Sequence, residues 1–249
     1  MKIAMGLLLC ALCTLTTGTA MAAEIRVLSA GAVEPGLRAA AAAFRKQSGH
    51  EVNIAFNTTP EIRKRIGGGD AFDVVIAPPA ALDEFAGAGK VAADRVDVGR
   101  VGLGVAVRPG APVPDISSSE ALKRSVLQAE SIVFNRASSG IYFENLLKKM
   151  GIYEQLQART TRYADGASVM EHVLKGKGRE IGFGPVTEIL QHREKGLKLV
   201  GPLPSEVQNY TSYSAAPTTA AANAELARVF VRYLGSPEGK ALFVAAGID

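Results

Sequence analysis

The sequence predicts an α/β fold of two lobes, each with a mainly parallel sheet, joined by strands that cross between them. Short β-rich segments alternate with amphipathic helical segments, a pattern that places helices on both faces of a parallel sheet. The alternation restarts after a proline-rich stretch at 109–114, which predicts a second lobe. Two helical segments follow the last predicted strand at the end of the chain.

In the first lobe each early strand is expected to lead into a helix. Apolar residues recur at spacings of 4, 4 and 3 along the first helix, which puts them on one buried face. These residues are Val33, Leu37, Ala41 and Phe44. The expected strands are 25–30, 51–57, 73–77 and 101–107, and the expected helices are 35–47, 61–66 and one that ends at Gly87.

The second lobe is expected to repeat this pattern and to return the chain to the first lobe. Its first helix, 120–127, has Ser118 or Ser119 as a cap. The further expected helices are 139–150, 167–175 and 186–195, and the strands are 131–135, 180–184 and 197–200. Segment 210–215 is expected to cross back, followed by helices 223–234 and 237–246 on the first lobe. The predicted lobes are thus 24–105 with 212–249, and 106–211.

Residues 1–22 have the pattern of a secretory signal, which predicts export to the periplasm. A positive residue precedes the apolar run Ile3–Leu15, and a small-x-small pattern ends at Ala22, where cleavage is expected. Both cysteines, Cys10 and Cys13, lie inside this segment. The mature chain is therefore expected to have no disulfide and no thiolate metal site.

The charge balance does not favour nucleic acid as a partner. The formal net charge is +4, and it falls to +3 once Lys2 is removed with the signal. Tryptophan is absent and aromatic residues make up 6% of the chain, so little material exists for stacking on bases. We expect a monomer that attracts small anions weakly.

Catalytic and metal-binding motifs do not emerge from the sequence. It contains neither a Gly-x-Ser-x-Gly elbow nor an HExxH motif. His50 begins a strand, and His172 and His192 fall within helices, where we expect them to be exposed. The acidic pairs near Asp73 and Asp97 have no histidine or third acid at ligand spacing. A hydrolase is thus the weaker alternative, and no cofactor or metal is expected.

Three loops stand out because each follows a strand and leads into a helix: 31–34, 57–59 and 136–140. Ligands of open α/β sheets bind beyond the carboxyl ends of the strands, and helix N-termini there favour anions. The candidate ligand-binding residues in these loops are Gly31, Ala32, Thr58, Thr59, Arg136, Ser138 and Ser139. Ordinary helix capping is the alternative for each hydroxyl.

The mature chain resembles the periplasmic molybdate-binding proteins of ATP-driven (ABC-type) importers, which have the two-lobed type II periplasmic binding fold. The resemblance covers 25–248. Its most telling segments are 27–37, 56–66, 73–76, 139–142, 181–183 and 233–238. It implies an oxyanion held between the lobes by hydroxyls and backbone N–H groups, without a metal, and a permease in the inner membrane as partner.

The resemblance also assigns site residues. Thr59 falls where the family has a ligand-binding serine, and Ser139 and Ala167 fall where backbone N–H groups contact the anion. Ala32 and Pro185 depart from the pattern, because the family has a serine and a tyrosine there. Each lost hydrogen bond to a charged ligand is worth about 1.5–3 kcal/mol. The resemblance therefore predicts the fold better than it predicts the identity of the ligand.

We therefore predict the solute-binding component of an importer that captures a small, molybdate-like anion in an interlobe cleft. Arg136 would contribute a positive charge to the binding of this anion, and an arginine also suits a carboxylate. The alternatives are a binding protein for an organic carboxylate or another small solute, and a sensor that presents its ligand to a receptor.

Overall fold

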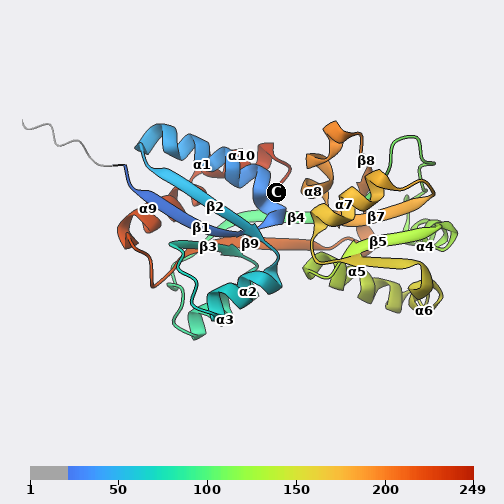
Figure 1. The fold of residues 1–249 in the computed structure, drawn as a ribbon, viewed down its shortest axis with the longest axis horizontal. Coiled ribbons are helices and arrows are strands. Elements are labelled where there is room, and N and C mark those ends of the chain that lie inside the picture. The colour runs from blue at the N-terminus through green and yellow to red at the C-terminus, as the bar shows by residue number, and fades with distance from the viewer. Residues whose placement is uncertain (1–21) are drawn as a thin grey trace, which may run out of the picture.

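The computed structural model describes residues 22–249, which form two α/β lobes side by side along the long axis of the molecule (Figure 1). The strands are β1 (Glu24–Ala30), β2 (Glu51–Asn57), β3 (Val74–Ala77), β4 (Val96–Val107), β5 (Ser131–Asn135), β6 (Thr160–Tyr163), β7 (Glu180–Pro185), β8 (Lys198–Pro202) and β9 (Tyr210–Pro217). The helices are α1 (Glu34–Ser48), α2 (Thr59–Gly67), α3 (Pro79–Gly87), α4 (Ser119–Gln128), α5 (Ser138–Lys149), α6 (Tyr153–Leu156), α7 (Gly166–Lys175), α8 (Val186–Gln191), α9 (Ala224–Gly235) and α10 (Pro237–Ala245). Short 3-10 turns lie at Gly31–Val33, Gln157–Arg159, Arg193–Lys195 and Ser205–Val207.

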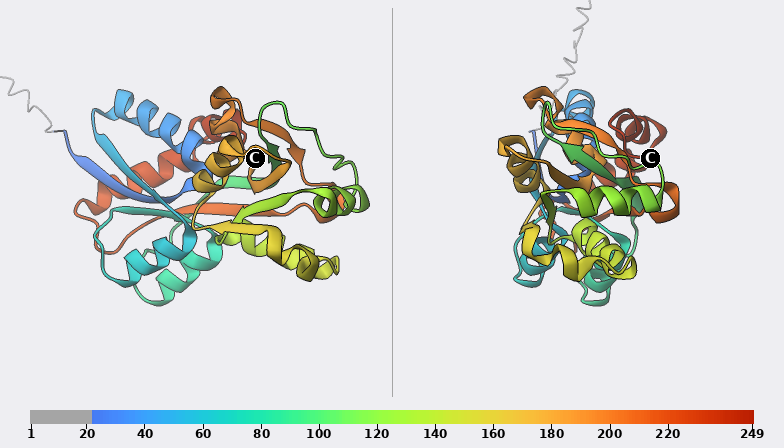
Figure 2. Two further views of the ribbon diagram at one scale, coloured as in Figure 1. Left: turned by 45° about the vertical axis from the view of Figure 1, so that its right-hand side comes forward. Right: turned by 90° about the vertical axis from the view of Figure 1, so that its right-hand side faces the viewer.

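The first lobe contains a sheet in the order β2-β1-β3-β9-β4, covered by helices on both faces. β1 pairs in parallel with β2 and β3, whereas β9 runs antiparallel to β3. Helices α1, α9 and α10 pack together on one face, and α2 and α3 pack on the other (Figure 1 and Figure 2). Leu28, Leu37 and Phe230 are among the fully buried side chains of its core. The two last helices thus pack against the sheet and the first helix of this lobe.

The second lobe contains β8, β4, β7, β5 and β6 in that order, and β5 is parallel to both of its neighbours. Neighbouring side chains of a strand point to opposite faces of the sheet. Phe134 accordingly packs with Phe143 on the face covered by α4, α5 and α6, whereas Val133 packs with Met170 and Ile189 under α7 and α8. Both faces of this sheet are therefore covered, as expected for parallel strands.

Strands β4 and β9 connect the two lobes. β4 pairs with β9 over Val96–Gly102 and with β7 and β8 over Leu103–Val107. The change of partner lies inside a regular strand, before the proline-rich stretch 109–114 from which the sequence analysis inferred the crossing. β4 also begins earlier than the predicted 101–107, because pairing with β9 orders a segment whose Asp97 and Gly99 weaken the local strand signal.

Most predicted elements agree with the structure to within one or two residues, and the differences have local causes. The predicted helix 186–195 is divided into α8 and the 3-10 turn Arg193–Lys195. Strand β6 and the single-turn helix α6 were missed, because both are short and their sequences are largely polar. Pairing of β6 with β5 supplies the order that the local sequence does not.

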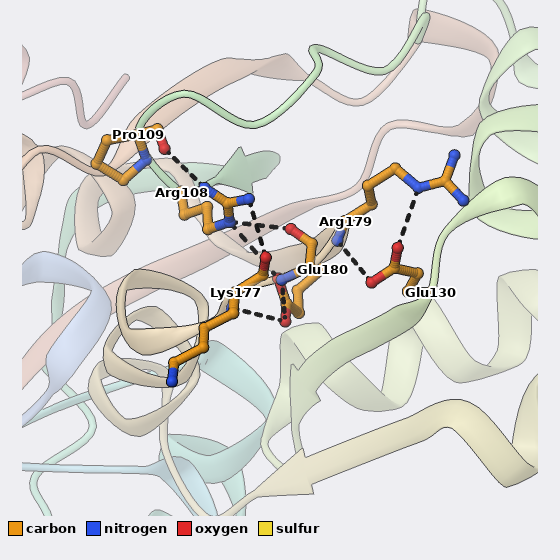
Figure 3. Close-up of polar contacts among 7 residues, drawn as sticks. Arg108, Pro109, Glu130, Lys177, Arg179 and Glu180 are labelled. Atoms are coloured by element: carbon orange, nitrogen blue, oxygen red, sulfur yellow. Dashed lines mark hydrogen bonds and ion pairs between the residues drawn. The ribbon is translucent and has the colours of Figure 1, made fainter.

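Charged side chains fix the outer end of the second lobe, around the turn that precedes β7 (Figure 3). Arg108 Nε donates to the Gly178 carbonyl oxygen at 2.9 Å, and Arg108 Nη2 donates to that of Lys177 at 3.1 Å. Glu180 Oε1 accepts the N–H groups of Lys177 and Gly178 at 3.2 and 3.0 Å. Glu180 begins β7, so this network lies at the opposite end of the strand from Pro185 and serves to hold the turn.

None of the helices between residues 22 and 249 has the length and apolar character needed to cross a membrane. The predicted signal segment lies outside the described residues except for Ala22, its last residue.

Replacing Gly36 by alanine is expected to destabilise the first lobe. A Cβ atom at Gly36 would lie 2.5 Å from Phe243 Cδ1 and 3.0 Å from Phe243 Cα, where α1 crosses α10. Such overpacking costs about 1–3 kcal/mol, which urea unfolding would measure as a lower free energy of unfolding. In the control Gly67→Ala the added Cβ meets no atom within 4 Å. Equal stabilities of Gly36→Ala and the parent protein would contradict the close packing of these helices.

Candidate functional site

A cavity of about 400 Å³ opens between the two lobes, at the carboxyl ends of β1, β2, β5 and β7. Ligands of open α/β sheets bind at this position. Its lining from the first lobe and β9 consists of Ala30, Gly31, Ala32, Glu34, Phe56, Asn57, Thr58, Thr59, Glu61 and Tyr213. The second lobe contributes Asn135, Ala137, Ser138, Ser139, Ala164, Asp165, Gly166, Ala167, Pro185, Glu188, Gln191 and His192. We refer to this cavity as the interlobe cleft.

Helices α2, α5 and α7 begin at the interlobe cleft. The N–H groups in the first turn of a helix have no intrahelical partner, and the helix dipole adds partial positive charge there. Of these three helices only α7 is capped by the side chain of its own N-cap residue, since Asp165 Oδ1 accepts the N–H of Ser168 at 2.8 Å. Thr58 occupies the N-cap position of α2 without making such a bond. The two lobes therefore present backbone donors to one cleft, an arrangement that favours anions.

The buried side chain of Asn135 shapes the loop between β5 and α5. Its Oδ1 accepts the N–H groups of Ala137 and Gly140, both at 3.0 Å, and its Nδ2 donates to Ser139 Oγ at 3.0 Å. Gly140 is required here because a Cβ atom would overlap the Asn135 carbonyl oxygen. Asn135 thus hydrogen-bonds the Ser139 hydroxyl, while Ser138 and Ser139 both line the cleft.

A hydrogen bond between the lobes places Glu188 in the cleft. The buried hydroxyl of Thr187, on α8, donates to the carbonyl oxygen of Ala32 in the turn after β1, at 2.7 Å. The next residue, Glu188, then lies between the two lobes. A Cβ at Gly31 would be 3.5 Å from Glu188 Oε1, and a Cβ at Gly166 would overlap Glu188 Oε2. Glycine at 166 therefore leaves the space that the carboxyl group fills.

The Glu188 carboxyl group has no cationic partner in the described chain. Its Oε2 atom is buried and forms no hydrogen bond within residues 22–249. Burial away from water, together with the nearby charges of Asp165 and Glu34, raises the pKa of Glu188 from 4.5 to about 7. Glu34 itself pairs with Arg38 on the same helix, at 2.7 Å.

Two further titratable side chains line the cleft beside Glu188. His192 is only 7% exposed, and its Nδ1 lies 3.0 Å from the Glu188 carbonyl oxygen. A carbonyl can only accept, so Nδ1 carries the hydrogen and Nε2 is left as an acceptor in the neutral ring. The expectation that His192 is exposed was wrong, because the residue lies at the end of α8 and lines the interlobe cleft. Burial, with the charge of Glu188, raises the pKa of Tyr213.

The structure brings most of the predicted site residues together. Those that line the cleft are Gly31, Ala32, Thr58, Thr59, Ser138, Ser139 and Ala167. Arg136 is not among the lining residues: its side chain is exposed, and its backbone N–H donates to the Tyr163 carbonyl oxygen at 2.8 Å. The predicted cationic contribution is thus missing from the cleft, while Pro185 and Ala32 line it without offering side-chain donors.

Sequence reasoning missed Glu188, His192 and Tyr213. Nothing in their local sequence separates them from ordinary helix and strand residues. The same strand-end rule that selected the other loops would have pointed to the start of α8 if it had been applied to β7. Within residues 22–249 no three His, Cys, Asp or Glu side chains are grouped as the ligands of a metal ion would be.

The chain belongs to the family of bacterial extracellular solute-binding proteins, which matches residues 25–249. Its fold is that of the periplasmic molybdate-binding protein of Azotobacter vinelandii, with a TM-score of 0.76 and 20% identity over 90% of this chain and 98% of that one. The sulfate-binding protein of Mycobacterium tuberculosis gives a TM-score of 0.73 at 16% identity, over 91% and 86% of the two chains. The resemblance inferred from the sequence is confirmed at the level of family and fold.

A curated relative with higher identity has a different description. The aconitate isomerase of a Pseudomonas species is 31% identical over 231 residues, which covers 90% of this chain and 87% of the relative. This chain, which belongs to a family of binding proteins, thus has a relative that is named as an enzyme.

Glu188 is expected to make the stability of the unliganded protein depend on pH. Its pKa is higher in the folded chain, about 7, than its ordinary value of 4.5, so the folded state binds the proton more tightly. The stabilisation is complete below about pH 4.5 and is lost as the pH rises through 7, an effect on the order of 3 kcal/mol. Urea unfolding at a series of pH values should therefore show that the free energy of unfolding falls as the pH rises. This fall should be absent in Glu188→Gln.

The matched control for this experiment is Glu194→Gln, an exposed carboxylate just beyond α8. It should leave the pH profile as in the parent protein. An unchanged profile in Glu188→Gln would mean that another group causes the fall.

Proposed function

We propose that the protein is an exported solute-binding protein that captures a small organic polycarboxylate in the interlobe cleft. Closure of the lobes on the anion would create the shape that the permease of an ATP-driven importer recognises. The observation that carries this proposal is the convergence of the first turns of α2, α5 and α7 on one cleft. Their backbone N–H groups can bind several carboxylate oxygens from both lobes at once.

Two features favour a polycarboxylate over a molybdate-like oxyanion. Ala32 and Pro185 replace two donors expected of a molybdate site, which removes side-chain hydrogen bonds that a tetrahedral oxyanion would need. The cavity of about 400 Å³ falls in the range of sites for organic ligands and leaves room around an ion with a single central atom. The 31% identity to an aconitate isomerase supports the same choice, since aconitate is a tricarboxylate.

Binding is expected to depend on Thr59, which is 6% exposed and lines the cleft at the start of α2. In a calorimetric titration with trans-aconitate, Thr59→Val should weaken binding by roughly 10- to 150-fold, because a hydrogen bond to a charged group contributes about 1.5–3 kcal/mol. The matched control is Thr161→Val in β6, outside the cleft lining. If molybdate or sulfate binds and polycarboxylates do not, the choice of ligand is wrong; equal affinities of Thr59→Val and the parent protein would remove Thr59 from the site.

A second candidate function, favoured by the aconitate isomerase relative, is isomerisation of an unsaturated acid in the same cleft. Moving the double bond requires a group that takes a proton from one carbon and returns it to another. His192 lines the cleft with Nε2 as its free acceptor, which suits this role.

Proton NMR in D₂O tests this candidate directly. Incubation of the protein with trans-aconitate should produce signals of the cis isomer and deuterium at the exchanged carbon. His192→Gln should abolish both while trans-aconitate still binds in a thermal-shift assay. Binding by the parent protein without any conversion would leave capture as the function and reject the enzyme.

A further inference from the structure

The interlobe cleft contains more negative charge than an anion site should tolerate. Glu34 from α1, Asp165 at the N-cap of α7 and Glu188 from α8 all line it. Glu34 is paired with Arg38, and Asp165 is engaged by the N–H of Ser168. Glu188 has neither kind of partner, so an incoming carboxylate would meet an uncompensated buried charge if Glu188 were ionised.

The surroundings of Glu188 supply no cation from any packed element. Glu34 and Asp165 are the charged groups that face it from α1 and α7, and Tyr213 faces it from β9. On its own helix the neighbouring titratable group is His192, whose Nδ1 donates to the backbone carbonyl of Glu188. The two carboxylates favour the neutral form of the Glu188 carboxyl group, because an ionised Glu188 would be repelled by both.

The position of the carboxyl group is fixed from both lobes. The Thr187 bond to Ala32 holds the start of α8 against the first lobe, and the space left by Gly166 receives Oε2. Glu188 lines the cleft, so its carboxyl group can meet a ligand that binds there.

We propose that Glu188 is a proton-carrying ligand group: in the complex it is protonated, donates its hydrogen to a carboxylate oxygen of the bound anion, and makes capture of the anion take up a proton from solution. This proposal rests on the proposed function, since it assumes that the cleft binds an organic polycarboxylate. A protonated carboxyl group becomes a donor, whereas an ionised one can only accept. Protonation of Glu188 thus removes its repulsion of the bound anion and adds a hydrogen bond to it.

The consequence is a linkage between pH and affinity. In the empty cleft the pKa of Glu188 is about 7, and a bound anion raises that pKa further. Above pH 7 the empty protein has lost this proton and must regain it on binding. The affinity for a fully ionised anion is therefore expected to fall by about tenfold per pH unit above neutrality, and to level off below it.

Calorimetric titration of the mature protein with trans-aconitate at about pH 8, in HEPES and in Tris buffer, measures the proton directly. The two buffers have different heats of ionisation, so the difference in observed heat gives the number of protons taken up. The parent protein should take up close to one. Glu188→Gln, whose amide is a permanent neutral donor, should bind with little pH dependence and take up none, and Glu194→Gln should behave like the parent.

Each result is decisive. Binding by the parent protein without proton uptake, or uptake that persists in Glu188→Gln, would overturn the assignment of Glu188 and leave the proposed function standing. A complete lack of trans-aconitate binding would overturn the proposed function and this proposal with it. If Glu188→Gln does not fold, the pH dependence of the dissociation constant of the parent protein decides: a flat profile from about pH 6 to 9 would reject the proposal.

Discussion

Backbone N–H groups that have no partner inside their own helices are the feature on which the site depends. In both lobes parallel strands end at the interlobe cleft, and the helices that follow them begin there. The helices α2, α5 and α7 cannot satisfy the donors of their first turns internally. In the proposed complex, a bound anion would satisfy them from both lobes at once. The strands β4 and β9 connect the two lobes between which the cleft opens.

The carboxyl groups of the cleft define which anion is compatible with these donors. Glu188 is held beside the first lobe by the Thr187 bond to Ala32, in a space that depends on glycine at 166. Such a group opposes a small, fully ionised oxyanion that has to be surrounded by donors. It can be complementary to a larger acid whose carboxylates lie at some distance from one another and can share a hydrogen with it.

How far the sequence predicts this site follows from where each residue lies. Thr59 and Ser139 could be located because each follows a strand with a clear local pattern and begins a helix. Glu188 and His192 were missed: the strand-end rule would have pointed to the start of α8, but which side chains of this helix enter the cleft depends on the way α8 packs against the first lobe. Arg136 shows the reverse case: its loop was identified correctly, but the loop geometry set by Asn135 and by the bond to Tyr163 leaves its side chain exposed.

The central claim is that the amides at the starts of α2, α5 and α7 bind the anion. Two-dimensional ¹H–¹⁵N NMR of the mature protein, recorded during a titration with trans-aconitate, tests it most directly. The amide signals of Thr59, Ser139 and Ala167 are expected to move downfield together with one common dissociation constant, because each amide would form a new hydrogen bond to a carboxylate. Saturation of the protein without shifts at these amides, or with shifts confined to one lobe, would contradict it.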